Sequence, residues 1–420
     1  MSDERSLIVG LDLGNEVSQL AVYDRELMEP VLMGQSEDNP DALIDTIVSF
    51  EGRDDISGFL DSLRDGSRIR MGAKKVDPER VVAYFFKKTL ALTRGRYPGE
   101  KIKMLVITVP EMNKDFVDRL YEALSLIGLE SDRVKIIDHK RSYMYYVLYQ
   151  RKELWTNDVG LFDYDGENLI YEQLKIDRTH TPSLVGVSER NLTETFAREI
   201  DAAAGAMPQN MSEAVTDEEE LYLSKKGAVF ENLVRGVLRS QYISSLFMTG
   251  DGFETEWADA VFPRLAVGRR LFRGRNLYVS GAVYAAREFS GGNRLDDYLI
   301  FAPDMVPASL SIDVYSGGHT EELLIARAGE PWFEVDTSFD LIPDGDTEIP
   351  VNIKPAFDGE AKTVMLDITP VAGKADRMTR LEIRTRFESR DTAIFTICDK
   401  GFGETMPGTD RVWEEAVKCS

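Results

Sequence analysis

Short apolar runs and longer segments with helical spacing alternate through the first 150 residues. An apolar run at residues 7–9 meets a turn bounded by glycines, and a second alternating run covers residues 17–23, a pattern that predicts a β-hairpin. Helical and strand patterns then alternate over residues 76–92, 101–110, 114–128, 134–137 and 142–149. Strands that alternate with helices in this way predict a parallel sheet.

A second strand, acidic turn and strand follow at residues 158–174, and they repeat the pattern of the opening hairpin. We expect two duplicated halves whose acidic hairpins face one cleft. A polar, helix-prone stretch comes next. The following segments predict a strand at residues 244–249, a helix at 254–265 and a short helix at 281–289.

After about residue 295 the pattern changes to short strands separated by turn residues. Seven such runs cover residues 310–315, 321–326, 332–339, 347–355, 362–368, 380–388 and 392–398. They predict a β-sandwich, and a closing helix is expected at residues 411–418. The expected domains are therefore residues 1–295 and 307–420, joined by an apolar linker at 296–306.

Composition and charge narrow the classes of partner. The chain has 420 residues and a formal charge of -23, which would repel nucleic acid and anionic membranes. The polar start and the absence of an 18-residue apolar run lead us to expect a cytoplasmic protein. Cys398 and Cys419 are too few for a disulfide framework, and His139, His180 and His319 are too scattered to predict a metal cluster.

The turn of the first hairpin carries the clearest candidate chemistry. Asp12 lies between Gly10 and Gly14. Glycines let backbone N–H groups approach a phosphate, and a carboxylate beside them can hold a hydrated cation. The alternative is an ordinary hairpin that needs glycines only for its turn geometry.

In their order, these segments resemble the actin-like ATPase superfamily, and within it the DnaK-type heat-shock chaperones. GLDLGNEVS resembles the first phosphate loop, DVGLFDYDGENLIYEQL stands where the second belongs, and SSLFMTGDGFETEW resembles the adenosine strand and its glycine turn. YLIFAPDMVPASLSIDV resembles the apolar interdomain linker. The resemblance implies a two-lobed actin-like fold of duplicated ribonuclease-H-like halves. A β-sandwich similar to the peptide-binding domain would follow, without the helical lid.

The resemblance also implies a set of site residues. ATP or ADP would be held by the glycine-rich turns, and Mg²⁺ by Asp12 and Asp163. The implied nucleotide-binding residues are Gly10, Asp12, Gly14, Asn15, Asp163, Gly166, Gly250 and Gly252. The lysine that assists hydrolysis corresponds to Lys74 or Lys75, and these two remain candidate catalytic residues with Asp12 and Asp163.

Departures from the family pattern weaken the expectation of hydrolysis. Asn15 and Glu16 replace two hydroxyl residues, and His139 replaces a glutamate. In the second loop Asp163 is followed by Tyr164, Asp165, Gly166, Glu167 and Asn168, where the family has one apolar residue, three glycines and a threonine. Added carboxylates oppose the charge neutralisation that phosphoryl transfer needs.

We therefore expect a chaperone-like protein with a degenerate nucleotide pocket and little or no ATP hydrolysis. It would bind a protein or an extended peptide through its β-domain. Candidate contacts there are the aromatic residues Trp332, Phe333 and Phe339. The alternatives are an active DnaK-type ATPase that couples hydrolysis to peptide binding, and an actin-like assembly protein.

Overall fold

The computed structural model describes residues 6–49, 55–72, 74–179, 181–205, 215–302, 304–343, 348–357, 359–368, 379–409 and 411–419. The chain forms two compact units. The first comprises Met1–Lys175 and Val187–Asp296, and the second comprises Ile176–Gly186 and Asp297–Ser420. Among the helices described, none is long and apolar enough to cross a membrane.

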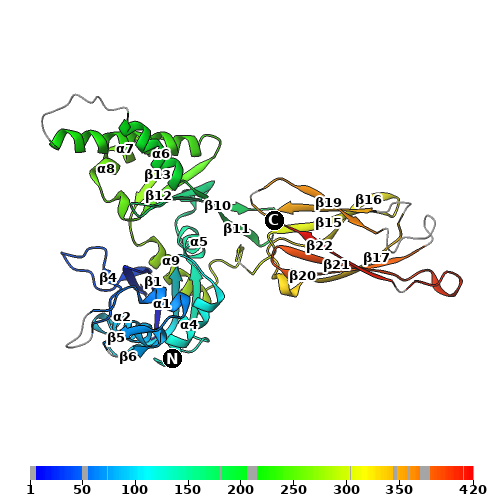
Figure 1. Cartoon of the computed structure of the whole chain (residues 1–420), viewed down its shortest axis with the longest axis horizontal. Coiled ribbons are helices and arrows are strands. Elements are labelled where there is room, and N and C mark those ends of the chain that lie inside the picture. Colours follow the sequence, from blue (N-terminus) through cyan, green and yellow to red (C-terminus); the bar gives the residue numbers. More distant parts are fainter. Residues whose placement is uncertain are drawn as a thin grey trace. The chain divides into compact units, whose positions relative to one another are not determined.

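The first unit begins with a mixed sheet (Figure 1). β1 pairs antiparallel with β2 and parallel with β7, and β7 pairs parallel with β8, so the predicted hairpin and the predicted parallel pairing are both confirmed. In spatial order, the strands are β3 (Glu29–Leu32), β2 (Val17–Asp24), β1 (Ser6–Leu13), β7 (Lys101–Val109) and β8 (Val134–Asp138), with β4 (Leu43–Asp45) beside β2.

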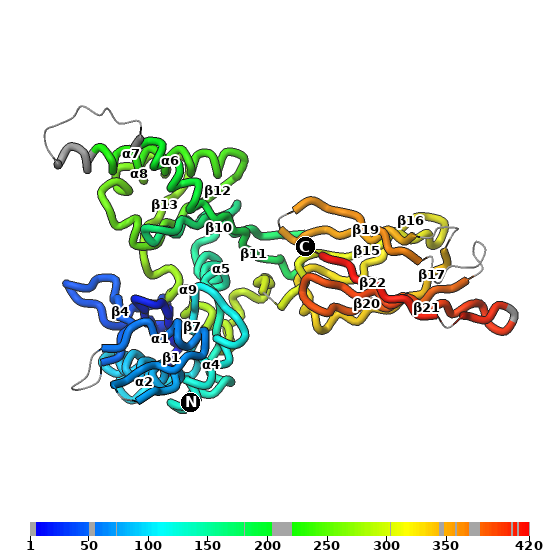
Figure 2. Tube along the Cα trace, viewed as in Figure 1, coloured from blue at the N-terminus to red at the C-terminus, as the bar shows by residue number. Residues whose placement is uncertain are grey.

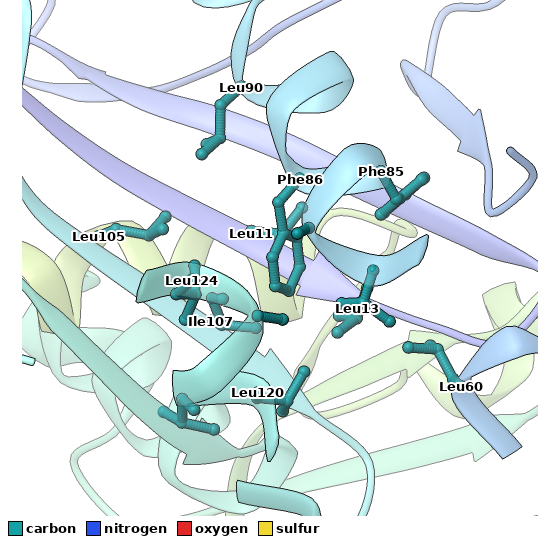
Figure 3. Packing of buried hydrophobic residues seen from close by; sticks show 14 of the residues in the cluster. Leu11, Leu13, Leu60, Phe85, Phe86, Leu90, Leu105, Ile107, Leu120 and Leu124 are labelled. Atoms are coloured by element: carbon teal, nitrogen blue, oxygen red, sulfur yellow. The ribbon is translucent and has the colours of Figure 1, made fainter. Parts of the chain in front are cut away.

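One face of this sheet is covered by helices that follow β4 and β7. Leu11 and Leu13 of β1 are fully buried there against Phe86 and Leu120 (Figure 3). The covering helices are α1 (Phe59–Asp65), α2 (Pro78–Leu90) and α4 (Lys114–Ser125), and α3 (Thr93–Arg96) and the hairpin of β5 (Ile69–Met71) and β6 (Lys74–Val76) lie between them in sequence.

The opposite face of β1 meets helices α5 (His139–Tyr149) and α9 (Leu277–Phe289). Side chains alternate along a strand, so Gly10 and Asp12 point to the face opposite Leu11 and Leu13. A Cβ at Gly10 would lie 2.6 Å from the backbone nitrogen of Val283 in α9. α9 is longer than the short helix predicted at residues 281–289, because its first turn also packs in the core.

The second sheet of this unit repeats the strand order of the first. β9 pairs antiparallel with β10 and parallel with β12, and β12 pairs parallel with β13. In order, its strands are β13 (Arg270–Arg273), β12 (Ile243–Thr249), β9 (Asp158–Tyr164), β10 (Leu169–Asp177) and β11 (Ser183–Asn191), and β14 (Tyr298–Ile300) follows β11 at the edge. One face is covered by α6 (Thr193–Gly205), α7 (Val215–Val237) and α8 (Glu256–Leu265) (Figure 2).

The second unit is rich in strands. Its two antiparallel sheets share one hydrophobic cluster that includes Leu310, Val351, Ile383 and Phe395. The first sheet contains β16 (His319–Ala326), β15 (Ala308–Ser316), β18 (Glu348–Pro355) and β19 (Lys362–Asp367), and the second contains β17 (Asp336–Leu341), β20 (Leu381–Ser389), β21 (Thr392–Asp399) and β22 (Val412–Lys418).

Three features of the second unit differ from the sequence expectations. The tail predicted as a helix is β22, because it pairs with β21 and buries Val417. The run expected as a strand at 332–339 begins with a 3-10 turn, Trp332–Glu334, before β17. Within the range expected to be a linker, β14 (Tyr298–Ile300) pairs parallel with Ser183–Val185.

Candidate functional site

The carboxylate of Asp12 is paired with a histidine. α5 begins at His139 because the Asp138 side chain caps the helix by accepting a hydrogen bond from the backbone N–H of Arg141 at 2.7 Å. This cap places the imidazole on the first turn, and His139 Nε2 lies 2.8 Å from Asp12 Oδ1. The family resemblance identifies His139 only as the replacement of a glutamate, not as a partner of Asp12.

The carboxylate of Asp163 is held by a tyrosine of α9. The hydroxyl of Tyr278 donates a hydrogen bond to Asp163 Oδ2 at 2.7 Å. The Tyr278 ring stacks on the His139 ring, with centroids 3.8 Å apart and an interplanar angle of 13°. Asp12, His139, Tyr278 and Asp163 therefore form one connected group, which we call the Asp–His–Tyr–Asp chain.

Burial and charge set the protonation of this chain. Burial would lower the pKa of His139, but the carboxylates of Asp12 and Asp163 outweigh it, so the pKa of His139 is raised. Burial raises the pKa of Asp163, and the Tyr278 hydrogen bond opposes that rise. Burial also raises the pKa of Tyr278 well above its usual value, which keeps its hydroxyl a donor. The raised pKa favours the protonated form of His139 beside Asp12.

Glu172 of β10 is a further buried acidic residue near the Asp–His–Tyr–Asp chain. The register of β9 with β10 places Glu172 opposite Leu161, on the sheet face to which Asp163 also points. Glu172 is 5% exposed, and its Oε2 has no hydrogen-bond partner among the described atoms. Burial, reinforced by the charge of Asp163, raises the pKa of Glu172 to about 8. An acidic residue within the apolar run LIYEQL was the only sequence signal for it.

In the first predicted phosphate loop, polar groups are already used in hydrogen bonds within the protein. The Asn15 amide donates to Asp61 at 3.1 Å and accepts from Arg64 at 2.9 Å, so this side chain is tied to α1. A Cβ at Gly14 would lie 2.3 Å from the carbonyl oxygen of Val17. The turn of this hairpin therefore requires a glycine at position 14.

The second predicted phosphate loop is closed by a side chain. The carboxylate of Asp165 accepts hydrogen bonds from the backbone N–H groups of Glu167 at 2.8 Å and Asn168 at 2.6 Å. Gly166 has a φ of 109°, which suits glycine, and its carbonyl accepts from the Tyr164 hydroxyl at 2.8 Å. Two N–H groups that could otherwise approach a phosphate are thus already used.

The glycine turn after β12 is packed against the second loop. A Cβ at Gly250 would lie 2.3 Å from the Tyr164 carbonyl oxygen, and one at Gly252 would lie 2.2 Å from the Tyr164 ring. The Tyr164 ring also packs edge-on against Trp257, and the ammonium of Lys226 lies 5.0 Å from the Tyr164 centroid. The ring of Tyr164 therefore fills the space beside the turn expected to hold adenosine.

Comparison with protein families finds a match that covers most of the first unit. Residues 52–302 match the model described as Family of unknown function (DUF5716) C-terminal. The chain belongs to this family. Residues 305–419 match a second model, Domain of unknown function (DUF8552). No curated protein matches the chain.

The DUF5716 match contains His139, Asp163, Glu172 and Tyr278 but begins after Asp12. Three of the four residues of the Asp–His–Tyr–Asp chain thus belong to the matched region. Neither family description names an activity.

The predicted lysines of this DUF5716 chain lie apart from the aspartates. Lys74 and Lys75 are exposed on β6, and within the described part of the chain no hydrogen bond or ion pair joins either one to Asp12 or Asp163. The residues that the structure describes contain no group of three or more His, Cys, Asp or Glu side chains arranged to hold a metal ion. Asp12 Oδ1 is already engaged by His139 and Asp163 Oδ2 by Tyr278, so these two atoms would have to lose those contacts to bind a magnesium ion.

Proposed function

We propose that this chain is a chaperone-like protein with a degenerate, non-hydrolytic nucleotide pocket, and that it binds a protein or an extended peptide. The observation that carries the proposal is the 2.8 Å pair of Asp12 and His139. An aspartate that holds hydrated Mg²⁺ needs oxygen atoms free for its water shell. In this chain the imidazole of His139 takes the place of such water at Asp12 Oδ1.

Two further observations support an actin-like arrangement without turnover. The order β3-β2-β1-β7-β8 in the first sheet matches β11-β10-β9-β12-β13 in the second, as expected for duplicated halves, with β4 added to the first sheet and β14 to the second. The helices that end the two repeats pack closely, since a Cβ at Gly281 of α9 would lie 2.0 Å from the Ser142 carbonyl of α5. Such halves would serve as a scaffold in which the Asp–His–Tyr–Asp chain replaces a bound nucleotide as the link.

Partner binding is assigned to the second unit, in the β-sandwich suggested by its two sheets. Phe333 is 60% exposed, whereas Trp332 and Phe339 pack against the hydrophobic cluster. Exposed aromatic side chains provide large contact areas at protein interfaces. Phe333 is therefore the aromatic contact that we propose.

Nucleotide dependence is tested by thermal unfolding of the whole chain with ATP or ADP, with and without Mg²⁺, together with phosphate release. We expect no magnesium-dependent rise of the midpoint and no phosphate release above buffer, since a ligand of the native state must raise the midpoint. Magnesium-dependent turnover that is lost in Asp12→Ala contradicts the proposal and favours an active ATPase.

Partner binding is tested with an array of immobilised extended peptides probed with the whole chain. We expect a subset of peptides to bind, and Phe333→Ala to weaken that binding about tenfold, as expected for an interface aromatic residue. Phe402→Ala is the matched control, because Phe402 is also exposed in the second unit. If the two substitutions weaken peptide binding equally, Phe333 is not an interface residue.

A further inference from the structure

A basic segment interrupts this acidic protein. Residues 264–275 contain five arginines and no aspartate or glutamate, in a chain with 73 acidic and 50 basic residues. The five are Arg264, Arg269, Arg270, Arg273 and Arg275. The segment includes the whole of β13, so the positive charge is concentrated on one strand and its flanks.

Carboxylates compensate some of these arginines. Arg264 pairs with Glu231 and Arg273 with Asp259, both at 2.6 Å, and Arg275 pairs with Asp251. Arg270 is exposed, and among the described residues it forms no ion pair. Arg270 is therefore the cation of β13 available to an external carboxylate.

β13 is also an open edge of the second sheet, since only β12 pairs with it in the part of the chain described. The backbone N–H of Gly274 donates to the Met248 carbonyl of β12 at 3.1 Å. Main-chain groups alternate in direction along a strand, so those of Leu271 and Arg273 point away from β12. A further strand could pair with these groups.

Apolar side chains lie beside this edge. Phe272 is 37% exposed and stacks on Phe247, with ring centroids 5.1 Å apart, on the same sheet face as Arg270. Val267, in the turn before β13, is 76% exposed, and Tyr242, just before β12, is 85% exposed. An open edge with exposed apolar groups and an unpaired cation has the features of a strand-addition site.

We propose that the free edge of β13 binds an extended acidic segment of a partner protein as an added strand. A carboxylate of that segment lies beside Arg270, and an apolar side chain lies beside Phe272. A second copy of this edge is disfavoured because like-charged arginines would face each other, which is a common protection of edge strands. Nucleic acid is disfavoured because it has no polypeptide main chain to pair with the free edge.

The test uses the whole chain and a fluorescein-labelled peptide of Glu-Thr-Val-Thr repeats, in which glutamate and valine lie on the same face of the strand, with binding followed by fluorescence anisotropy. We expect binding that weakens with salt, and about tenfold weaker binding in Arg270→Glu, the size expected for reversing a contacting charge. Arg94→Glu is the matched control, because Arg94 is an exposed arginine on α3. The peptide with lysine in place of glutamate should bind at least tenfold more weakly.

A second measurement leaves the protein unchanged. Methylation of alternate backbone nitrogens in the peptide should abolish binding, because it blocks the main-chain hydrogen bonds of an added strand. The proposal is overturned if the acidic peptide does not bind, or if Arg270→Glu, the lysine peptide or backbone methylation leaves binding unchanged. Self-association that Arg270→Glu removes would identify a second copy as the occupant instead. Tighter binding of labelled single-stranded DNA would identify nucleic acid.

Discussion

The imidazole of His139 and the phenol of Tyr278 lie face to face, and each ring holds the aspartate of a different hairpin. His139 comes from α5 and Tyr278 from α9, so the two acidic strands are joined through the two helices that separate them. Two aromatic rings, each hydrogen-bonded to an aspartate, thus occupy the position where the sequence predicted a cation.

This relationship predicts energetic coupling between Asp12 and His139. Asp12→Asn and His139→Gln should each lower the free energy of unfolding by about 1–3 kcal/mol. Each substitution leaves the other side chain partly buried without its native hydrogen-bonding partner. The double variant should lose less than the sum of the two. Urea denaturation of all four proteins measures the coupling, and additive losses would show that the pair contributes nothing.

Glu172 predicts a loss of stability as the pH rises. Its pKa is raised from 4.5 to about 8 in the folded protein by burial and by Asp163, with Lys140 and His139 opposing and Glu189 adding to the rise. Between these two values the native state holds the proton more tightly than the unfolded chain, so the free energy of unfolding falls.

Glu172→Gln should abolish this fall of the free energy of unfolding with rising pH. At pH 9 the variant should be more stable than the wild type by roughly 2–4 kcal/mol, since one pKa unit corresponds to about 1.4 kcal/mol. At pH 4 the two proteins should differ little. Denaturation across this pH range is the measurement, and parallel curves for the two proteins would contradict the assignment.

The turn after β12 predicts a strong dependence on Gly250. Its φ is 97°, and an added Cβ would lie 2.3 Å from the Tyr164 carbonyl oxygen. Gly250→Ala should therefore lower the free energy of unfolding by about 3 kcal/mol. Gly236→Ala in α7 is the control, because a Cβ there meets nothing within 4 Å and should stabilise the helix by about 0.5 kcal/mol.

Asp399 predicts an acid-sensitive component of stability in the second unit. Burial alone would raise the pKa of Asp399, but hydrogen bonds from the Thr379 hydroxyl and from the backbone N–H groups of Thr409 and Gly401 lower it to about 2. The stability gained is present above pH 3.8 and is lost as the pH falls towards 2.

Asp399→Asn should cost roughly 2 kcal/mol at pH 7, because an amide offers one acceptor oxygen in place of two charged ones. The difference from the wild type should shrink between pH 4 and pH 2. Thermal unfolding across that range measures it, and a constant difference would show that the carboxylate charge is not the cause.

Periodicity and turn residues predicted much of the fold. Both hairpins, the parallel strands and helices α2, α4 and α8 follow from local patterns. The prediction was wrong for β22, where helical spacing of Val412–Lys418 was overridden by pairing with β21. The start of α9 was missed because Leu277 and Tyr278 are set by packing against distant elements.

The candidate site was predictable only in part. Asp12 and Asp163 were marked by glycines near them in sequence, and the structure brings both into one connected group. Their actual partners, His139 and Tyr278, come from helices more than 100 residues away in sequence, so no local spacing could identify them. Lys74 and Lys75 were chosen from a strand and glycine pattern that many hairpins share.

The close approach of α9 to Gly10 has a consequence for biosynthesis. β1 is made first, but the helix that covers one of its faces begins only at Leu277. During translation that face of the first sheet therefore remains uncovered until nearly the whole first unit has emerged from the ribosome. Chains truncated before α9 should aggregate during translation, and this sheet should be among the last parts of the first unit to resist protease.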